Sequence, residues 1–323
     1  TLIKYADELL IKSASCPYRI SLDRFAWGST SDVANQAMLK IIAMKLKCLI
    51  KIIAGLSVIL LSSCNNSNQD QMTKANKAIF LHHSTGEGVI KGDVSKISWK
   101  LFKQGSFGKW LKDYNKDNKS NFIVDEVRFP KKQPYGWKNY PFDYYNIWVK
   151  HAGQEPYMEE PTLEMLTKDY GLIIFKHCYP VSKIEADSGN ANIDSEEKQL
   201  QNYKLQYEAL KAKMKSFPDT KFLVWTGATH VKANTTEEMA LRMKEWTNWV
   251  RNVWDEKGDN IFLWDFYELE TEGGLYLQDQ YAAMPNNSHP GEAFSVSVAP
   301  LFGQRVVDVL SGQGDVKPIT GKR

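Results

Sequence analysis

Two side chains far apart in the sequence have the types needed for hydrolysis by a nucleophile and a base. Ser84 follows a short apolar run and precedes a turn-like segment at residues 85–88. His289 lies in a segment rich in Asn, Pro and Gly, just ahead of a helix-like stretch. A serine hydroxyl is a poor nucleophile near neutral pH, so an imidazole must take its proton. The pair predicts catalysis by Ser84 with His289 as base, although a serine after a strand is more commonly a turn residue or a helix N-cap.

The elements that must position this pair alternate along the chain. Short apolar, β-branched or aromatic runs cover residues 78–81, 122–127, 171–175, 221–225 and 260–266. Longer stretches of helical character cover residues 99–114, 161–168, 195–216, 235–256 and 292–310. This alternation implies right-handed βαβ units and a five-stranded parallel sheet, so the predicted class is α/β. In such sheets functional groups collect beyond the carboxyl ends of the strands, where Ser84 and His289 would meet.

A targeting signal is predicted well inside the chain. Residues 44–63 combine a lysine-rich start, an apolar core at 52–61 and small residues before Cys64. This pattern is typical of a signal peptide, and the apolar core is short for a membrane span. Residues 61–64 resemble a bacterial lipobox, which implies lipidation of Cys64 and attachment to the cell envelope. Residues 64–76 then form a polar tether. The alternative is a buried helix of a larger fold.

The first 43 residues are interpreted as a fragment. Residues 24–38 resemble a segment of the family-nine glycoside hydrolases, which are (α/α)6 barrels. The resemblance covers only residues 1–43 and includes no carboxylate that matches the catalytic acid or base of that family. One or two helices of a barrel cannot bury a core of their own. We therefore expect no activity from this segment and translation from Met44.

Charge and cysteine content exclude several functions for the remainder. Because 8 of the 41 basic and 4 of the 38 acidic residues precede residue 64, residues 64–323 hold 33 basic and 34 acidic side chains. A nucleic-acid partner would require a clustered basic face, so none is expected. Cys178 is the one cysteine after Cys64, so neither a disulfide within the domain nor a cysteine metal cluster is predicted. We expect a monomer with no cofactor and no metal.

With these motifs in place, residues 77–312 resemble the SGNH (GDSL-like) hydrolase superfamily. The resemblance implies a flavodoxin-like three-layer α/β/α sandwich, a nucleophile after the first strand and a histidine before the last helix. Ser84 and His289 match those two places, although the usual Gly-Asp-Ser motif reads His82-His83-Ser84. The superfamily commonly hydrolyses esters, including acetyl groups on polysaccharides.

Two further motifs depart from the superfamily pattern. The acid that orients the histidine is missing, and Asn286 and Asn287 stand in its region, so Asn287 is the predicted third member. An amide holds an imidazole tautomer but does not stabilise imidazolium as a carboxylate does. The amide donor for the oxyanion is also missing after the third strand. Lys176 or His177 would replace it, together with the backbone N–H groups of Ser84 and Gly136.

Two other features leave alternatives open. The segment between the second strand and the next helix is rich in rings, including Tyr135 and Trp137, which would bind sugar faces or else form a small core of their own. Cys178 is a weaker candidate nucleophile, because a cysteine after a buried strand is more commonly inert.

The function predicted from these features is an envelope-anchored serine esterase that deacetylates a polysaccharide or oligosaccharide. The alternative is a non-catalytic glycan-binding lipoprotein on the same scaffold, which the missing acid and amide favour. Residues 313–323 are predicted to be a flexible tail.

Overall fold

The computed structural model describes residues 74–102, 104–138 and 140–323, which belong to a unit spanning Ser67–Arg323. The glycoside-hydrolase-like fragment (1–43), the signal peptide (44–63), Cys64 and most of the predicted tether (64–76) lie outside the described residues. The interpretation of those segments therefore stays a prediction.

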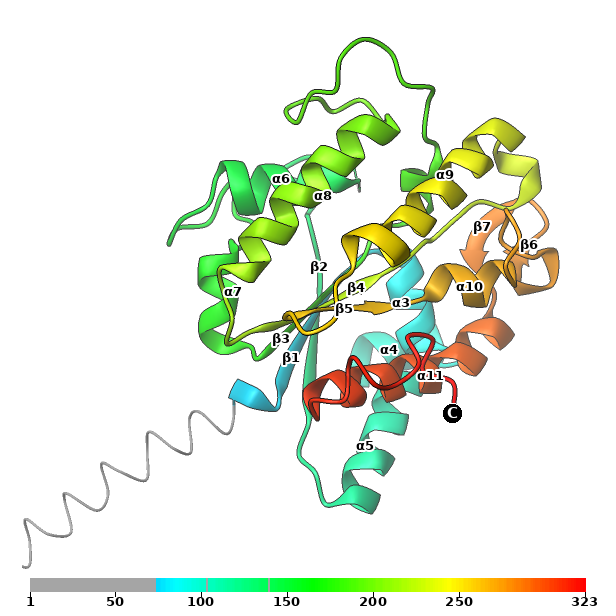
Figure 1. The fold of residues 1–323 in the computed structure, drawn as a ribbon. Helices are drawn as coiled ribbons and strands as arrows, with labels where there is room; N and C mark the ends of the chain where they lie inside the picture. The colour runs from blue at the N-terminus through cyan, green and yellow to red at the C-terminus, as the bar shows by residue number, and fades with distance from the viewer. Residues whose placement is uncertain (1–73, 103, 139) are drawn as a thin grey trace, which may run out of the picture. The chain divides into compact units, whose positions relative to one another are not determined.

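Five parallel strands form the central sheet in the order β2-β1-β3-β4-β5, which confirms the predicted α/β class (Figure 1). The strands are β1 (Lys77–His82), β2 (Ile123–Arg128), β3 (Leu172–Phe175), β4 (Lys221–Trp225) and β5 (Ile261–Trp264). The chain passes from β1 outward to β2 and then returns to β3 on the other side of β1. The order therefore reverses between β1 and β3, and open α/β sheets bind ligands beside such a reversal.

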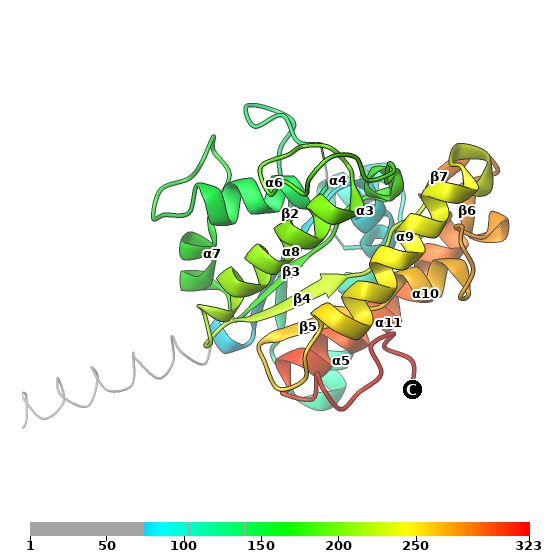
Figure 2. The ribbon, with the colours of Figure 1, turned by 45° about the horizontal axis from the view of Figure 1, so that its top comes forward.

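Helices cover both faces of the sheet and produce three layers (Figure 1). One layer contains α6 (Pro141–Tyr145), α7 (Leu163–Asp169), α8 (Leu200–Lys215) and α9 (Glu237–Trp249). In this layer α8 and α9 lie side by side (Figure 2). The other layer contains α3 (Ser84–Lys91), α4 (Lys96–Phe102), α5 (Ser106–Asn118), α10 (Phe266–Thr271) and α11 (Glu292–Leu310). An antiparallel hairpin of β6 (Ala282–Met284) and β7 (Asn287–Pro290) precedes α11.

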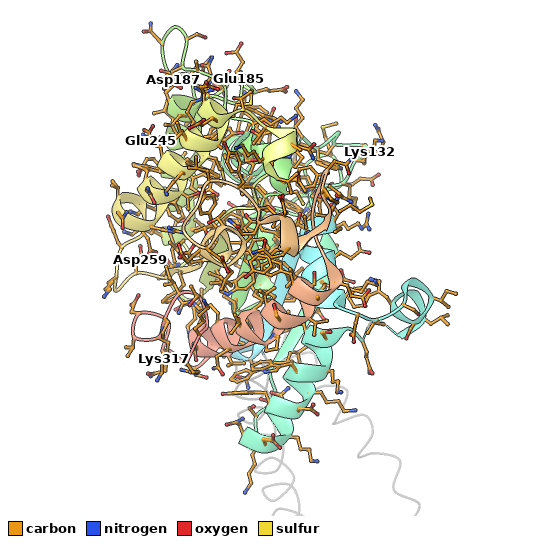
Figure 3. The ribbon with its side chains drawn as sticks, turned by 90° about the vertical axis from the view of Figure 1, so that its right-hand side faces the viewer. Lys132, Glu185, Asp187, Glu245, Asp259 and Lys317 are labelled. Carbon is orange, nitrogen blue, oxygen red and sulfur yellow. The ribbon has the colours of Figure 1, made fainter. Side chains whose placement is uncertain are left out.

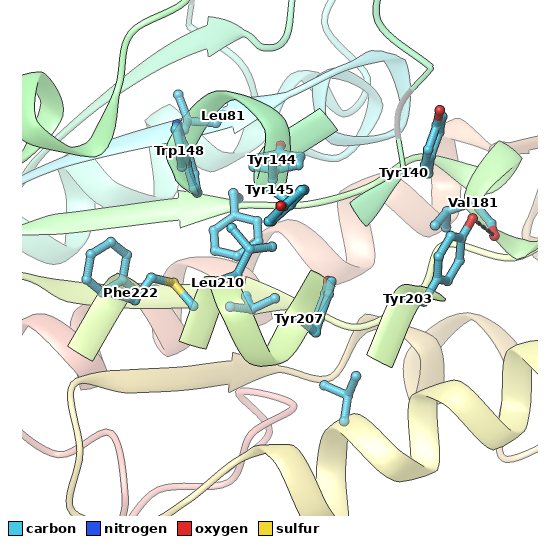
Figure 4. Packing of buried hydrophobic residues seen from close by; sticks show 14 of the residues in the cluster. Leu81, Tyr140, Tyr144, Tyr145, Trp148, Val181, Tyr203, Tyr207, Leu210 and Phe222 are labelled. Carbon is cyan, nitrogen blue, oxygen red and sulfur yellow. Dashed lines mark hydrogen bonds between the residues drawn. The ribbon is translucent and has the colours of Figure 1, made fainter. Parts of the chain in front are cut away.

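Alternation along the strands divides the apolar core between the two layers. In β1, Ile79 and Leu81 pack toward α6 and α8, whereas Ala78 and Phe80 pack toward α3 and α11. Most rings of the segment after β2 belong to the first of these clusters, where Tyr144 and Trp148 are fully buried (Figure 4). Most rings of the segment therefore join the main core on this face of the sheet instead of forming a separate small core.

Glycines explain two differences from the predicted elements. Residues 85–88 were predicted to be a turn, but α3 begins at Ser84. A Cβ on Gly86 would lie 2.6 Å from Cβ of His82, so the glycine lets α3 approach β1. The predicted helix at residues 99–114 is divided into α4 and α5. A Cβ on Gly105, the N-cap of α5, would lie 2.2 Å from the backbone oxygen of Ile90, so the chain approaches α3 too closely there for any other residue.

The end of the chain is also ordered against the domain, which corrects the predicted flexible tail. The Arg305 guanidinium donates to the Gly314 carbonyl at 2.7 Å, and the Trp264 indole donates to the Thr320 carbonyl at 3.1 Å. Within the described residues, α11 is long and apolar enough to cross a membrane, but it packs on the sheet as a core helix. Charged side chains of both signs, such as Lys132 and Glu245, project from the surface (Figure 3).

Candidate active site

The candidate nucleophile occupies the first turn of a helix. Ser84 directly follows β1 and His83, is exposed, and opens α3, whose ladder begins with the bond from the Glu87 N–H to the His83 carbonyl at 2.9 Å. The N–H groups of the first turn, including that of Ser84, have no place in this ladder. They carry the positive end of the helix dipole, which favours negative charge beside Ser84.

The hairpin before α11 carries the histidine to this helix. His289 lies on β7, and a Cβ on Gly88 of α3 would lie 3.5 Å from the Pro290 ring, so the two elements are in contact. His289 Nε2 lies 2.9 Å from Ser84 Oγ. The structure thus brings together two side chains that are 205 residues apart in the sequence, as the motifs predicted.

Asn287 fixes the protonation of the imidazole. Its Oδ1 accepts the backbone N–H of His289 at 3.1 Å and lies 2.8 Å from His289 Nδ1. A backbone N–H only donates, so the Asn287 atom is an acceptor and Nδ1 must carry the proton. Nε2 is then free of a proton and accepts the Ser84 hydroxyl. The amide therefore selects the tautomer that a general base requires, which is the role predicted for Asn287.

Electrostatics keep His289 neutral over a wider pH range. Partial burial lowers the pKa of His289, and the positive charge of Lys176 lowers it further. A neutral imidazole is the form that accepts a proton from serine.

A buried lysine and cysteine lie beneath Ser84, at the end of β3. Lys176 is fully buried, and its Nζ lies 3.1 Å from Cys178 Sγ, which is 4.0 Å from Ser84 Oγ. Burial lowers the pKa of Lys176. Burial is also the largest effect on the Cys178 thiol and raises its pKa, but the charge of Lys176 and the hydrogen bonds with Thr85 and Lys176 together leave the thiol pKa lowered. The Lys176 side chain therefore lies behind the nucleophile and does not reach the surface.

His177 lies elsewhere, which corrects its predicted role at the oxyanion. Its side chain is fully buried in the core beside α8, and its Nε2 lies 2.8 Å from the Tyr207 hydroxyl. Successive residues after a strand point to opposite faces. Lys176 and Cys178 therefore face the nucleophile, whereas His177 faces the opposite layer.

The segment after β2 contributes one ring beside the nucleophile. Trp137 is half-buried and stacks on His83, with ring centroids 4.1 Å apart. Gly136 is exposed with φ 83°, directly before Trp137. Tyr135 instead bonds within its own segment, where its hydroxyl accepts from Asn146 at 3.1 Å. Of the three predicted residues in this segment, Trp137 contacts His83, the residue directly before Ser84.

Tyr179 and His230 were not predicted as site residues, although both follow strands. The Tyr179 ring lies 4.9 Å from the rings of both His230 and His289, so it separates the two imidazoles. The usable signal was the position of Tyr179 directly after Cys178, at the end of β3.

Within residues 74–323 as described, no group of three or more His, Cys, Asp or Glu side chains is arranged to hold a metal ion. Neither a known protein-family model nor a curated protein matches this chain.

Proposed function

We propose that this protein is a serine hydrolase that cleaves esters, with Ser84 as nucleophile, His289 as general base and Asn287 as the residue that orients it. One observation carries the proposal. The His289 ring makes two hydrogen bonds, to Ser84 Oγ at 2.9 Å and to Asn287 Oδ1 at 2.8 Å. The first would carry the serine proton to the ring, and the second orients the ring. Nucleophilic catalysis by serine requires this arrangement of base and orienting group.

The proposed reaction follows from these positions. Ser84 Oγ attacks the ester carbonyl while His289 Nε2 takes its proton, and the tetrahedral oxyanion forms at the first turn of α3. There the backbone N–H of Ser84 and the positive charge of Lys176 stabilise the negative charge that develops on the oxyanion. The imidazolium then protonates the departing alcohol and leaves an acyl-serine. A water molecule, deprotonated by His289, attacks that acyl group and releases the acid and the free serine.

A carbohydrate ester is the proposed substrate class. Ser84 is exposed, which suits a small acyl group carried on a larger polymer. Trp137, stacked on the neighbouring His83, offers an aromatic surface of the kind that sugar faces contact. We place the enzyme in a bacterial envelope, anchored through Cys64, on the strength of the signal-like pattern at residues 44–64.

The catalytic proposal is tested with a small ester and a polymer. The chain from residue 65 onward is assayed on p-nitrophenyl acetate and acetylated xylan, and labelled with a fluorophosphonate that reacts with activated serines. Ser84→Ala is expected to abolish labelling and turnover. Ser297→Ala, which removes an α11 hydroxyl bonded to the Phe294 carbonyl, is the matched control. Equal turnover by wild type and Ser84→Ala would refute the assignment.

A second candidate is a glycan-binding protein without catalysis, because Asn287 stands where a carboxylate would stabilise imidazolium. Glycan binding measured by calorimetry that survives both Ser84→Ala and His289→Ala, without hydrolysis, would support it. Loss of binding in those variants alone would count against it.

The location is tested separately from the chemistry. Cys64→Ala is expected to release the protein from membranes, and cell-derived protein is expected to yield no peptide from residues 1–43. Peptides that join residues 24–38 to the domain would contradict both the start site and the lipid anchor.

A further inference from the structure

A polar cluster lies behind the strand that carries His289. Its centre is the hydroxyl oxygen of Ser288, the buried residue directly before His289 on β7. This oxygen accepts the backbone N–H of Val231 at 3.3 Å and the side-chain amide of Asn234 at 3.2 Å. His230 Nδ1 lies 2.8 Å from the same oxygen. All three partners come from the segment that follows β4.

The direction of the hydrogen bond between Ser288 and His230 follows from the number of lone pairs and protons on the hydroxyl. A serine hydroxyl has two lone pairs and one proton. The N–H groups of Val231 and Asn234 occupy both lone pairs, so the Ser288 proton must point to His230 Nδ1. His230 is then neutral and carries its proton on Nε2. Burial, together with the charges of Lys183 and Lys198, lowers the pKa of His230 to about 4, which is consistent with the neutral form.

The same segment also holds the turn of the hairpin. The Asn234 side-chain amide donates a second hydrogen bond to the Asn286 carbonyl at 2.8 Å. Asn286 lies in the turn that joins β6 to β7, so Asn234 contacts both the turn and the strand. The segment itself is joined to the domain beneath it, because the Thr229 N–H donates to the buried Glu270 carboxylate at 2.7 Å.

We propose that His230, Asn234 and Ser288 are positioning residues for the catalytic base, a set that we call the hairpin latch. They do not contact the reacting atoms. They fix β7 so that the imidazole of His289, the next residue along the strand, stays within hydrogen-bond distance of Ser84. The kinetic consequences of the latch rest on the serine hydrolase proposed above. The contacts that define it do not.

The latch is tested with variants that differ in one hydrogen-bonding group. His230→Asn keeps an acceptor near the Nδ1 position, whereas His230→Leu removes it. Asn234→Asp keeps the shape of the side chain but replaces the donor with a carboxylate facing two acceptors. Asn118→Asp is the matched control, because it removes a similar side-chain bond, to the Tyr114 carbonyl at 2.9 Å, on the distant helix α5.

Hydrolysis of p-nitrophenyl acetate is expected to separate these variants. His230→Leu and Asn234→Asp should lower kcat by about tenfold to a hundredfold, the range that a displacement of about 1 Å from the reactive geometry produces. KM should stay near the wild-type value, because the latch does not contact the substrate. His230→Asn and Asn118→Asp should retain most of kcat. Equal kcat in His230→Leu and His230→Asn, or a loss in KM alone, would overturn the proposal.

A second measurement is independent of activity. Hydrogen exchange of the peptide covering residues 281–291 is followed by mass spectrometry in each full-length variant. Faster exchange of this hairpin in Asn234→Asp than in Asn118→Asp supports the latch, even if the wild type hydrolyses nothing. An inactive wild type would refute the proposed function, whereas unchanged exchange in both latch variants would refute the latch.

Discussion

Replacing Asn287 with Asp places a carboxylate against the Nδ1–H of His289 at the 2.8 Å separation now occupied by an amide oxygen. Two unit charges about 4 Å apart attract by about 1 kcal/mol at the dielectric constant of water and about 4 kcal/mol at an effective value of 20. Both side chains are half-exposed, so solvent screening places the gain near the lower value. A gain of about 1.4 kcal/mol corresponds to a rise of about one unit in the pKa of His289.

The sign of the effect on activity follows from which form is the base. In the proposed mechanism His289 works as the neutral imidazole, so a higher pKa leaves it protonated at higher pH and inactive there. The acid limb of kcat/KM for p-nitrophenyl acetate should therefore move upward by about one pH unit in Asn287→Asp. Above that limb, the carboxylate stabilises the imidazolium that forms in the transition state, and kcat should rise by up to about tenfold.

The matched variant is Asn287→Ala, which removes the acceptor and frees the imidazole to adopt either tautomer. Its kcat should fall by at least about a hundredfold, because a triad with the wrong tautomer loses most of its rate. An acid limb that stays in place in Asn287→Asp, together with wild-type rates in Asn287→Ala, would refute the assigned tautomer and the role of Asn287.

Three further predictions concern Lys176, Gly86 and Tyr207. Lys176→Met removes a charge that lowers the pKa of the base, so the acid limb of kcat/KM should move to higher pH and kcat should fall; an unmoved limb would contradict the electrostatic role. Gly86→Ala introduces a Cβ 2.6 Å from Cβ of His82, so it should lower the stability measured by urea unfolding by about 1–3 kcal/mol and lower kcat as α3 shifts. Tyr207→Phe leaves the buried Nε2 of His177 without its partner, so it should lower the free energy of unfolding by about 1–3 kcal/mol while kcat stays unchanged. A loss of kcat without a loss of stability would show that His177 takes part in catalysis.

Much of the sheet was predictable because its strands are short, apolar and separated by polar helical stretches. The run at residues 221–225 corresponds to β4 residue for residue. The run at 260–266 was predicted too long, since a further aromatic residue, Phe266, follows Asp265. β5 ends at Trp264 because the Asp265 side chain caps α10 by accepting the Glu268 N–H.

The site was predictable where chain order decides the geometry and unpredictable where packing decides it. Ser84 and Asn287 follow from their places beside a strand end and a late histidine. Alternation alone puts Lys176 and His177 on opposite faces, but the sequence does not specify which of the two faces the nucleophile. The contacts of Tyr179, His230 and Ser288 depend on how the hairpin rests on the segment after β4, and no spacing in the sequence encodes that contact.

The 205 residues that separate Ser84 from His289 would give the proposed chemistry a particular timing. The serine follows β1, the first strand of this sheet to be synthesised, whereas its proposed base arrives on a hairpin that comes after all five strands of the sheet. A chain that stops anywhere before residue 287 carries an unactivated serine, whatever else it has folded. Labelling of Ser84 by a fluorophosphonate would therefore report that the whole sheet and its hairpin have assembled. A nascent or truncated chain without the hairpin would not be labelled.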